Sequence, residues 1–299
     1  MPNVLQKRNG DEHEFLFTAA DFARIRQLIY QHAGINLSQS KTHMVYSRLA
    51  RRLRATGRGS FAEYIALIER DACEWQNFIN ALTTNLTHFY REPHHFRILA
   101  DHIKSIVGDV AHNKRTVSLW CAAASTGEEA YSLAMTMVEL FDSFTPPVRI
   151  VATDLDTQVL AKAQAGIYAR ERAERLSPAM LKRFFLAGHG EYEGFVRVRP
   201  ELQALIAFRP LNLLEPGWAV RGPFDAIFCR NVMIYFDKPT QYKVLQRFVP
   251  LLRPDGLLFA GHSESFHHAH DLFATRGKTV YGLAANAKQT PAAKSKPKS

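Results

Sequence analysis

The chain has 299 residues, a formal net charge of +10 and an apolar fraction of 46%. Its length suits one large domain or two modest ones, and its composition is that of a folded protein rather than a disordered one. No apolar run approaches the roughly 20 residues that span a bilayer, and the N-terminus lacks the hydrophobic core of a signal peptide. We therefore expect a cytoplasmic protein without direct membrane insertion. The excess of positive charge favours an acidic partner.

The three cysteines are Cys73, Cys121 and Cys229, an odd number spread widely along the chain. Two of them lie in apolar, strand-like runs. This usage predicts free thiols in a reducing compartment rather than a disulfide framework.

Apolar residues at helical spacing predict a run of short helices, which we place in an N-terminal helical domain over 15–84. The segment "TAADFARIRQLIYQHAG" puts its apolar residues on one face and ends at Gly34, a helix-stop residue. The segment "SKTHMVYSRLARRLRATG" repeats this pattern and ends at Gly57. Its outer face carries cations without an interspersed acid: Lys41, Arg48, Arg51, Arg52, Arg54 and Arg58. We interpret this face as a docking surface for an acidic partner, and the plainer alternative is a solvated helix surface.

From Thr116 onward, strand-like and helix-like segments alternate. Helical patterns separate the strand-like runs "TVSLWC", "VRIVATD", "FDAIFCR" and "LLFAG". Such alternation predicts an α/β domain over 98–285, with a mainly parallel sheet and helices on both of its faces.

Three other segments do not follow this alternation of strands and helices. The stretch "GHGEYEGFVRVRPELQALIAFRP" combines glycine-marked turns with alternating apolar residues, which predicts an inserted antiparallel β-hairpin subdomain at about 186–210. Residues 85–97 are expected to form a linker between the two domains. The lysine-rich tail at 286–299 has little that could pack, so we expect it to be disordered.

Polar residues follow the predicted strands at one edge of the sheet. The first strand runs into a turn of small residues and then Glu128-Glu129, without the G-x-G-x-x-G spelling that binds a pyrophosphate. Asp154 ends the second strand, Asn212 follows another, and Arg230-Asn231 follows the strand "FDAIF". Since ligands of open α/β sheets bind beyond the carboxyl ends of the strands, these side chains are expected to surround one ligand.

S-adenosylmethionine fits these residues, because it has ribose hydroxyls, a sulfonium and an ammonium group but no phosphate. A carboxylate after the second strand can accept hydrogen bonds from both ribose hydroxyls, and one near the first turn can meet the ammonium group. Simpler explanations remain for single residues. Asp154 can be a helix N-cap, and Glu128 and Glu129 can complement a helix dipole.

The segments "TTNLTHFYREPHHF", "AAASTGEEAYSLAM", "FDAIFCRNVMIYFD" and "LLRPDGLLFAGHSESF" resemble the motifs of bacterial chemotaxis receptor methyltransferases, the CheR family. The resemblance extends from about Phe15 to Leu283. It implies a Rossmann-like methyltransferase sheet that uses S-adenosylmethionine and releases S-adenosylhomocysteine. It also implies methylation of glutamate side chains in the cytoplasmic domains of chemoreceptors, giving methyl esters for chemotaxis adaptation.

Carried over position by position, the resemblance places Arg91 and Tyr235 closest to the transferring methyl group. The cofactor contacts that it implies are Asn85, Thr87, Arg91, Glu129, Asp154, Asn212, Leu213, Arg230 and Asn231. Where the family usually has a second phenylalanine before the arginine, this chain has Tyr90. We expect no metal, because the run "HHAH" has neither the spacing nor the cysteines of a zinc site.

The alternative function is a nucleic-acid methyltransferase that uses the positive charge to hold phosphates. Against it, the residues after the strand are "RNVMIY" rather than the N-P-P-Y type that grips a base amine. We therefore expect no nucleic-acid partner. The β-subdomain offers an edge strand that could bind a receptor's C-terminal tail by strand addition, and we expect the protein to be a monomer.

Overall fold

The computed structural model describes residues 14–112 and 115–287. Contacts between residues divide the chain into two compact units, Met1–Thr83 and Thr84–Ser299. Most of the tail expected at 286–299 lies outside the described residues. Among those described, no helix combines the length and the apolar character that crossing a membrane requires.

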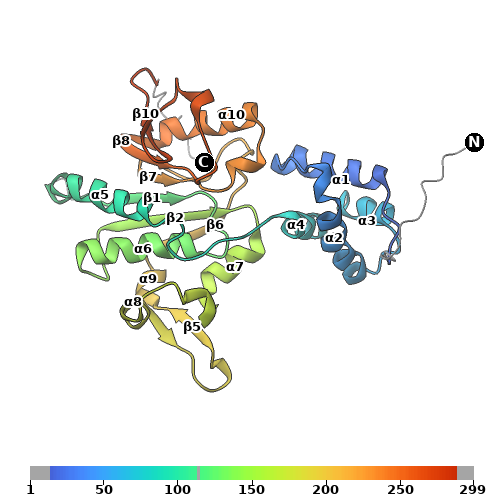
Figure 1. Cartoon of the computed structure of the whole chain (residues 1–299), viewed down its shortest axis with the longest axis horizontal. Helices are drawn as coiled ribbons and strands as arrows, with labels where there is room; N and C mark the ends of the chain where they lie inside the picture. Colours follow the sequence, from blue (N-terminus) through green and yellow to red (C-terminus); the bar gives the residue numbers. More distant parts are fainter. Residues whose placement is uncertain (1–13, 113–114, 288–299) are drawn as a thin grey trace, which may run out of the picture. The chain divides into compact units, whose positions relative to one another are not determined.

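Within its described residues, 14–83, the first unit contains helices and no strand, as the apolar spacing predicts (Figure 1). Thr18 begins the first helix with a capping box to Asp21, and Gly34 and Gly57 end two helices with φ of 65°. The elements of this unit are α1 (Ala19–Ala33), η1 (Gln39–Lys41), α2 (Thr42–Thr56), α3 (Phe61–Ile68) and α4 (Ala72–Leu82).

The second unit is built on a seven-stranded sheet with the order β6-β2-β1-β7-β8-β10-β9. Its strands are β1 (Val117–Cys121), β2 (Val148–Asp154), β6 (Ile206–Pro210), β7 (Phe224–Phe228), β8 (Leu252–Phe259), β9 (Phe273–Gly277) and β10 (Val280–Leu283). The five strands from β6 to β8 are parallel, and β10 runs antiparallel to both of its neighbours. The chain proceeds outward from β1 in one direction and then continues from β7 in the other. The order therefore reverses between β1 and β7, which is where open α/β sheets bind their ligands.

Two hydrophobic clusters cover the two faces of this sheet. The helices of this unit are α5 (His94–His112), α6 (Glu128–Phe141), α7 (Thr157–Ala165), α8 (Pro178–Phe184), α9 (Pro200–Gln203) and α10 (Lys238–Phe248). One cluster joins α5 and α6 to inward residues such as Leu119 and Ile150, and the other joins α10 to Trp120 and Ile227. The two clusters therefore place α5 and α6 on one face of the sheet and α10 on the other. The predicted α/β layering is confirmed.

A small antiparallel sheet is inserted in this unit, but its boundaries differ from the predicted 186–210. It consists of β3 (Ile167–Ala169), β4 (Phe185–Ala187) and β5 (Phe195–Val198), in the order β3-β5-β4. The last five residues of the predicted range form β6, which pairs with β2 of the large sheet. The prediction was wrong here because alternating apolar residues indicate a strand but not the sheet that it joins. A three-residue strand such as β3 is also too short to show a period.

The expected linker at 85–97 is an integral part of the second unit. Residues 83–93 form neither helix nor strand, and α5 begins at His94. The segment is fixed by packing, because the buried ring of Phe89 contacts the rings of Tyr168 and Phe185 at centroid distances of 5.2 and 5.5 Å. Residues of this segment therefore have defined positions relative to the sheet.

Candidate functional site

The turn after β1 is built from small residues because the neighbouring α7 approaches it closely. Gly127 has a φ of 97°, and a Cβ there would lie 2.8 Å from the Cβ of Ala163. The hydroxyl of Tyr168 donates to the carbonyl of Thr126 at 2.7 Å and fixes the end of the turn. Glycine is therefore required at position 127 for both backbone conformation and space.

Asp154 ends β2 beside this turn, and its carboxylate accepts N–H groups from Ser125 at 2.7 Å and Asp156 at 2.9 Å. The N-cap of α7 is Asp156, which accepts the N–H groups of Gln158 and Val159. The simpler explanation of Asp154 as the helix cap is therefore wrong. Its ionised carboxylate can only accept hydrogen bonds, as the two donating hydroxyls of a ribose would require.

Burial raises the pKa of the Asp154 carboxyl to about 6, and the N–H groups of Asp156 and Ser125 only partly oppose this shift. This carboxyl is partly removed from water and forms no ion pair within residues 14–112 and 115–287, so hydrogen-bond donors on a ligand would stabilise its charge. This environment fits a neutral diol next to the carboxylate.

Glu128 and Glu129 each form hydrogen bonds and an ion pair with specific side chains. They therefore do more than complement the dipole of α6. Glu128 is buried, accepts the hydroxyl of Thr126 at 2.6 Å and pairs with Arg172. Glu129 accepts from Arg230 at 2.6 Å. Only Glu129 therefore joins the other predicted site residues.

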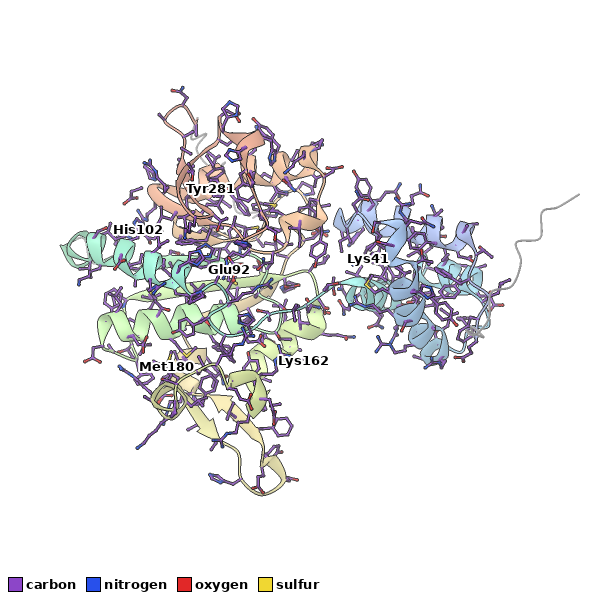
Figure 2. The ribbon with its side chains drawn as sticks, in the orientation of Figure 1. Lys41, Glu92, His102, Lys162, Met180 and Tyr281 are labelled. Atoms are coloured by element: carbon purple, nitrogen blue, oxygen red, sulfur yellow. The ribbon has the colours of Figure 1, made fainter. Side chains whose placement is uncertain are left out.

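Arg230 is buried and connects three parts of the site. Besides its bond to Glu129, it donates to the carbonyl of Arg91 at 2.6 Å and lies 3.3 Å from the carboxylate of Glu92. Two carboxylates around one guanidinium compensate the cost of burying its charge. Glu92 (labelled in Figure 2) was not among the predicted site residues, although it directly follows Arg91 in the quoted motif.

The segment before α5 is held at both of its ends. Asn85 donates to Asp156 at 2.9 Å, and its carbonyl accepts the hydroxyl of Ser125 at 3.2 Å. The guanidinium of Arg91 donates to the carbonyl of Leu86 at 2.8 Å. Asn85 is therefore bonded to the residues around Asp154, and the main chain of Arg91 is bonded to Arg230.

Asn212 and Leu213 follow β6, and Asn212 accepts the N–H of Leu214 at 2.9 Å. Sequence reasoning missed the residue that supports this loop. Arg247 of α10 donates to the carbonyl of Leu213 at 3.0 Å, and its guanidinium stacks 3.9 Å from the ring centre of Trp218. No local pattern links these residues, so only the fold brings them together.

Asn231 and Tyr235 lie on a tight turn after β7, and Tyr235 is half-buried at the end of η4 (Met233–Tyr235). Asn231 has a φ of 59°, in the left-handed region. Its N–H donates to the buried carboxylate of Glu264 at 2.9 Å. Within residues 14–112 and 115–287, no hydrogen bond engages the side chain of Thr87 or Tyr235.

Glu92, His94 and His95 place their ligand atoms within 4.8 Å of one another, in the described part of the chain. Arg230 already supplies a positive charge at 3.3 Å from Glu92. Burial and the charge of Arg230 lower the pKa of His95 to about 4, so its imidazole is neutral near pH 7. The expectation that the protein holds no metal remains a prediction.

Several cations of the predicted docking surface have partners that the sequence did not indicate. Arg48 donates to the carbonyls of Ala81 and Thr83, and Arg52 forms two hydrogen bonds, of 2.9 and 2.6 Å, with Glu74. Arg54 pairs with Glu14 at 2.9 Å, whereas Arg51 is exposed, as is Lys41 (labelled in Figure 2). The segment itself contains no acid, but Arg52 and Arg54 pair with Glu74 and Glu14 of other segments. The docking surface stays a prediction.

The three cysteines are free thiols, as predicted, and two of them, Cys121 and Cys229, are buried. Burial raises the pKa of both thiols well above the ordinary value.

Two family models match the chain and together cover most of it. The CheR methyltransferase all-alpha domain matches residues 20–83, and the CheR methyltransferase SAM binding domain matches residues 85–282. The second match contains every predicted cofactor contact.

Curated relatives agree with these models. A chemotaxis protein methyltransferase of Klebsiella aerogenes is 57% identical over 266 residues, which cover 88% of this chain and 89% of the relative. Chemotaxis protein methyltransferase 2 of Pseudomonas aeruginosa is 54% identical over 284 residues, covering 95% and 100%. The chemotaxis protein methyltransferase of Escherichia coli is 54% identical over 267 residues, covering 89% and 91%. Together with the carboxylate-lined end of the sheet and the lack of a G-x-G-x-x-G sequence in the turn after β1, these matches show that the chain belongs to the CheR methyltransferase family, whose cofactor is S-adenosylmethionine.

Proposed function

We propose that the protein methylates specific glutamate side chains in the cytoplasmic domains of chemoreceptors, and that it does so in the cytoplasm. The observation that carries the proposal is the position of Arg91. Its main chain is tied by Arg230 to Glu129, whereas its guanidinium donates only to the carbonyl of Leu86 among the described residues. The other N–H groups of Arg91 are thus available for an acceptor carboxylate.

The chemistry requires no general base. A glutamate side chain has a pKa of about 4.3, so the acceptor is ionised at neutral pH. Bound S-adenosylmethionine supplies a methyl group on a sulfonium centre. A carboxylate oxygen of the acceptor forms the new O–C bond as the C–S bond breaks, which leaves a methyl ester and neutral S-adenosylhomocysteine.

The residues of this chain therefore serve to orient the reactants and to control charge. Arg91 holds one oxygen of the acceptor and leaves the other directed toward the methyl group. Tyr235 donates to the acceptor carboxylate or forms a wall of the methyl pocket. Holding two reactants in an attack geometry can contribute about 7–11 kcal/mol to lowering the barrier.

The cofactor contacts that we propose are those that the family resemblance implies. Asp154 accepts the two ribose hydroxyls, and Glu129 meets the ammonium group. The remaining contacts that we propose are Asn85, Thr87, Asn212, Leu213, Arg230 and Asn231, with Arg91 beside the methyl group.

Two surfaces are proposed to bring the receptor to the site. The exposed cations Lys41 and Arg51 of the first unit would attract an acidic helical bundle. In the small sheet, β4 pairs with β5 and with no other strand in the described part of the chain, so its other edge can accept an extended receptor tail. A hollow of about 430 Å³ adjoins this edge and would receive the side chains of the tail. Its lining is mostly apolar, with Leu186, Tyr192 and Phe195, and also includes Arg197.

Transfer of a labelled methyl group to receptor-containing membranes tests the proposal. We expect label on the receptor that mild base releases as methanol, because an ester hydrolyses under conditions in which a methylated amine or base survives. Arg91→Ala is expected to reduce kcat by about 100-fold or more, because positioning is lost. Label that resists base, or that appears on added nucleic acid, would reject the function.

A further inference from the structure

The loop that follows β8 has no part in the proposed function, although it lies in one of the motifs that resemble the family. β8 is the parallel neighbour of β7, and Phe259 is paired with Phe228 in their register. The N–H of Cys229 also donates to the carbonyl of Phe259 at 2.9 Å. The loop at 261–264 therefore adjoins the turn that carries Asn231 and Tyr235.

Glu264 is the buried acid of this loop, with 5% of its surface exposed. Its carboxylate accepts the N–H groups of Asn231 at 2.9 Å, Ile234 at 3.3 Å and Gly261 at 2.5 Å. No cationic side chain in the described part of the chain forms an ion pair with it. Backbone N–H groups are therefore what compensates the buried negative charge.

Two of these N–H groups, three residues apart, define the shape of the turn after β7. The left-handed φ of 59° at Asn231 is uncommon for a residue with a side chain. Bonds from the N–H groups of Asn231 and Ile234 to one carboxylate hold the turn in this conformation. η4, which ends at Tyr235, begins within the same stretch.

The loop also packs against the turn without intervening space. A Cβ at Gly261 would lie 2.2 Å from the amide nitrogen of the Asn231 side chain and 2.8 Å from its backbone nitrogen. Only glycine fits such an approach without displacing its neighbour. Glycine and glutamate of one loop thus constrain the same turn, the first by contact and the second by hydrogen bonds.

We propose that Glu264 is a positioning residue for methyl transfer, acting through the turn from Asn231 to Tyr235. It is not a catalytic residue, because it is almost wholly buried and its oxygens are engaged by backbone N–H groups. This role rests on the function proposed above. It predicts that an amide cannot replace the acid. The two carboxylate oxygens both accept backbone N–H groups, and the NH2 group of a glutamine would face the donors of one of these oxygens.

Steady-state methylation of receptor membranes by the full-length Glu264→Gln variant tests this role. Calorimetric titration with S-adenosylhomocysteine counts the folded, binding-competent sites, so that kcat refers to those sites alone. We expect kcat to fall about tenfold or more while the KM for receptor is retained, because Tyr235 is misplaced and the docking cations are untouched. Glu264→Asp, which retains the charge, is expected to keep more of kcat than Glu264→Gln.

Asp225→Asn is the matched control. Asp225 is another buried carboxylate on β7, near the opposite end of the strand, where it accepts the N–H of Ser118 and pairs with Arg115. Its loss is expected to lower the melting temperature but to leave kcat per competent site as in the wild type. If Glu264 had only a structural role, Glu264→Gln would also lower the melting temperature and leave kcat per competent site as in the wild type.

If the wild-type enzyme is active and Glu264→Gln has the same kcat, the positioning role is rejected. The proposed function is unaffected by that result. If that variant does not fold, kcat per competent site is measured for Gly261→Ala, which displaces the same turn while the carboxylate remains. A wild-type kcat in Gly261→Ala would then reject the positioning role. A wild-type protein that transfers no methyl group to receptors would instead reject the proposed function, and this role with it.

Discussion

At the residue scale, Asp154, which we propose as a cofactor contact, shows how burial changes the pKa of a carboxyl group. Its pKa is raised to about 6 from 3.8, because the loss of water outweighs the N–H groups of Asp156 and Ser125. Between these two values the folded free protein binds one proton more than the unfolded chain does. The stability of the free protein contributed by this group therefore falls as the pH rises through that window.

Cofactor binding is expected to show the opposite pH dependence, because only the ionised carboxylate accepts both ribose hydroxyls. The affinity for S-adenosylhomocysteine should rise from about pH 5 to about pH 7 and then level off, with about a tenfold gain per pH unit at the acid end. Calorimetry at several pH values measures this.

Asp154→Ala should abolish binding. Asp154→Asn should bind weakly at every pH, whereas Asp142→Asn, which changes an exposed carboxylate outside the site, should follow the wild type. An affinity of the wild type that is flat across this range would contradict the assigned ribose contact.

At the scale of one element, two neighbouring arginines of α2 have different environments. Arg52 neutralises Glu74, which is buried and also accepts the hydroxyl of Tyr64. This arginine thus joins α2 to α4 and, through Glu74, to α3. Arg51 is exposed and has no such partner in the described chain. Charge along a helix therefore does not by itself identify a docking surface.

We expect Arg52→Ala to lower the free energy of unfolding by about 1–3 kcal/mol, because it leaves a buried carboxylate without its cation. Arg51→Glu should leave the free energy of unfolding unchanged and raise the KM for receptor. The KM of this variant should also depend less on ionic strength than that of the wild type. Thermal unfolding and receptor methylation at two ionic strengths measure these effects.

Arg70→Glu is the matched control for Arg51→Glu, since it makes the same charge change at an exposed arginine of the first unit outside α2. Equal effects of the two reversals on receptor methylation would reject α2 as the docking surface and favour a general effect of net charge.

At the scale of the whole molecule, cofactor binding and receptor docking are assigned to different units. Every predicted cofactor contact lies in Thr84–Ser299, which has its own hydrophobic clusters, whereas the cations proposed for docking lie in Met1–Thr83. Units with separate cores can fold independently.

A fragment that starts at Thr84 is therefore expected to retain S-adenosylhomocysteine binding and to methylate receptors about tenfold more slowly or worse. Calorimetry and the labelled-methyl assay on the same preparation measure both properties. A fragment that folds by circular dichroism but has lost cofactor binding would show that the first unit contributes to the site.

Much of this architecture could be predicted from sequence, and the failures have a common origin. Apolar spacing located the helices that end at Gly34 and Gly57 and the strands β1, β2, β7 and β8, because such periods are local. The assignment of β6 to the small sheet failed, since strand pairing depends on a partner far along the chain. Glu92, Arg247 and Glu264 escaped notice because they act on the site through bonds to distant segments.

The sequence by itself determined the two units, the alternation of strands and helices, and the motifs that identify the family and its cofactor. Only the tertiary structure decided that Asp156 rather than Asp154 caps α7, that Glu129 meets an arginine 101 residues away, and that Arg52 is not free for docking. Periodicity and capping depend on residues within a few positions of one another. Burial and charge pairing depend on which distant segments the folded chain brings into contact.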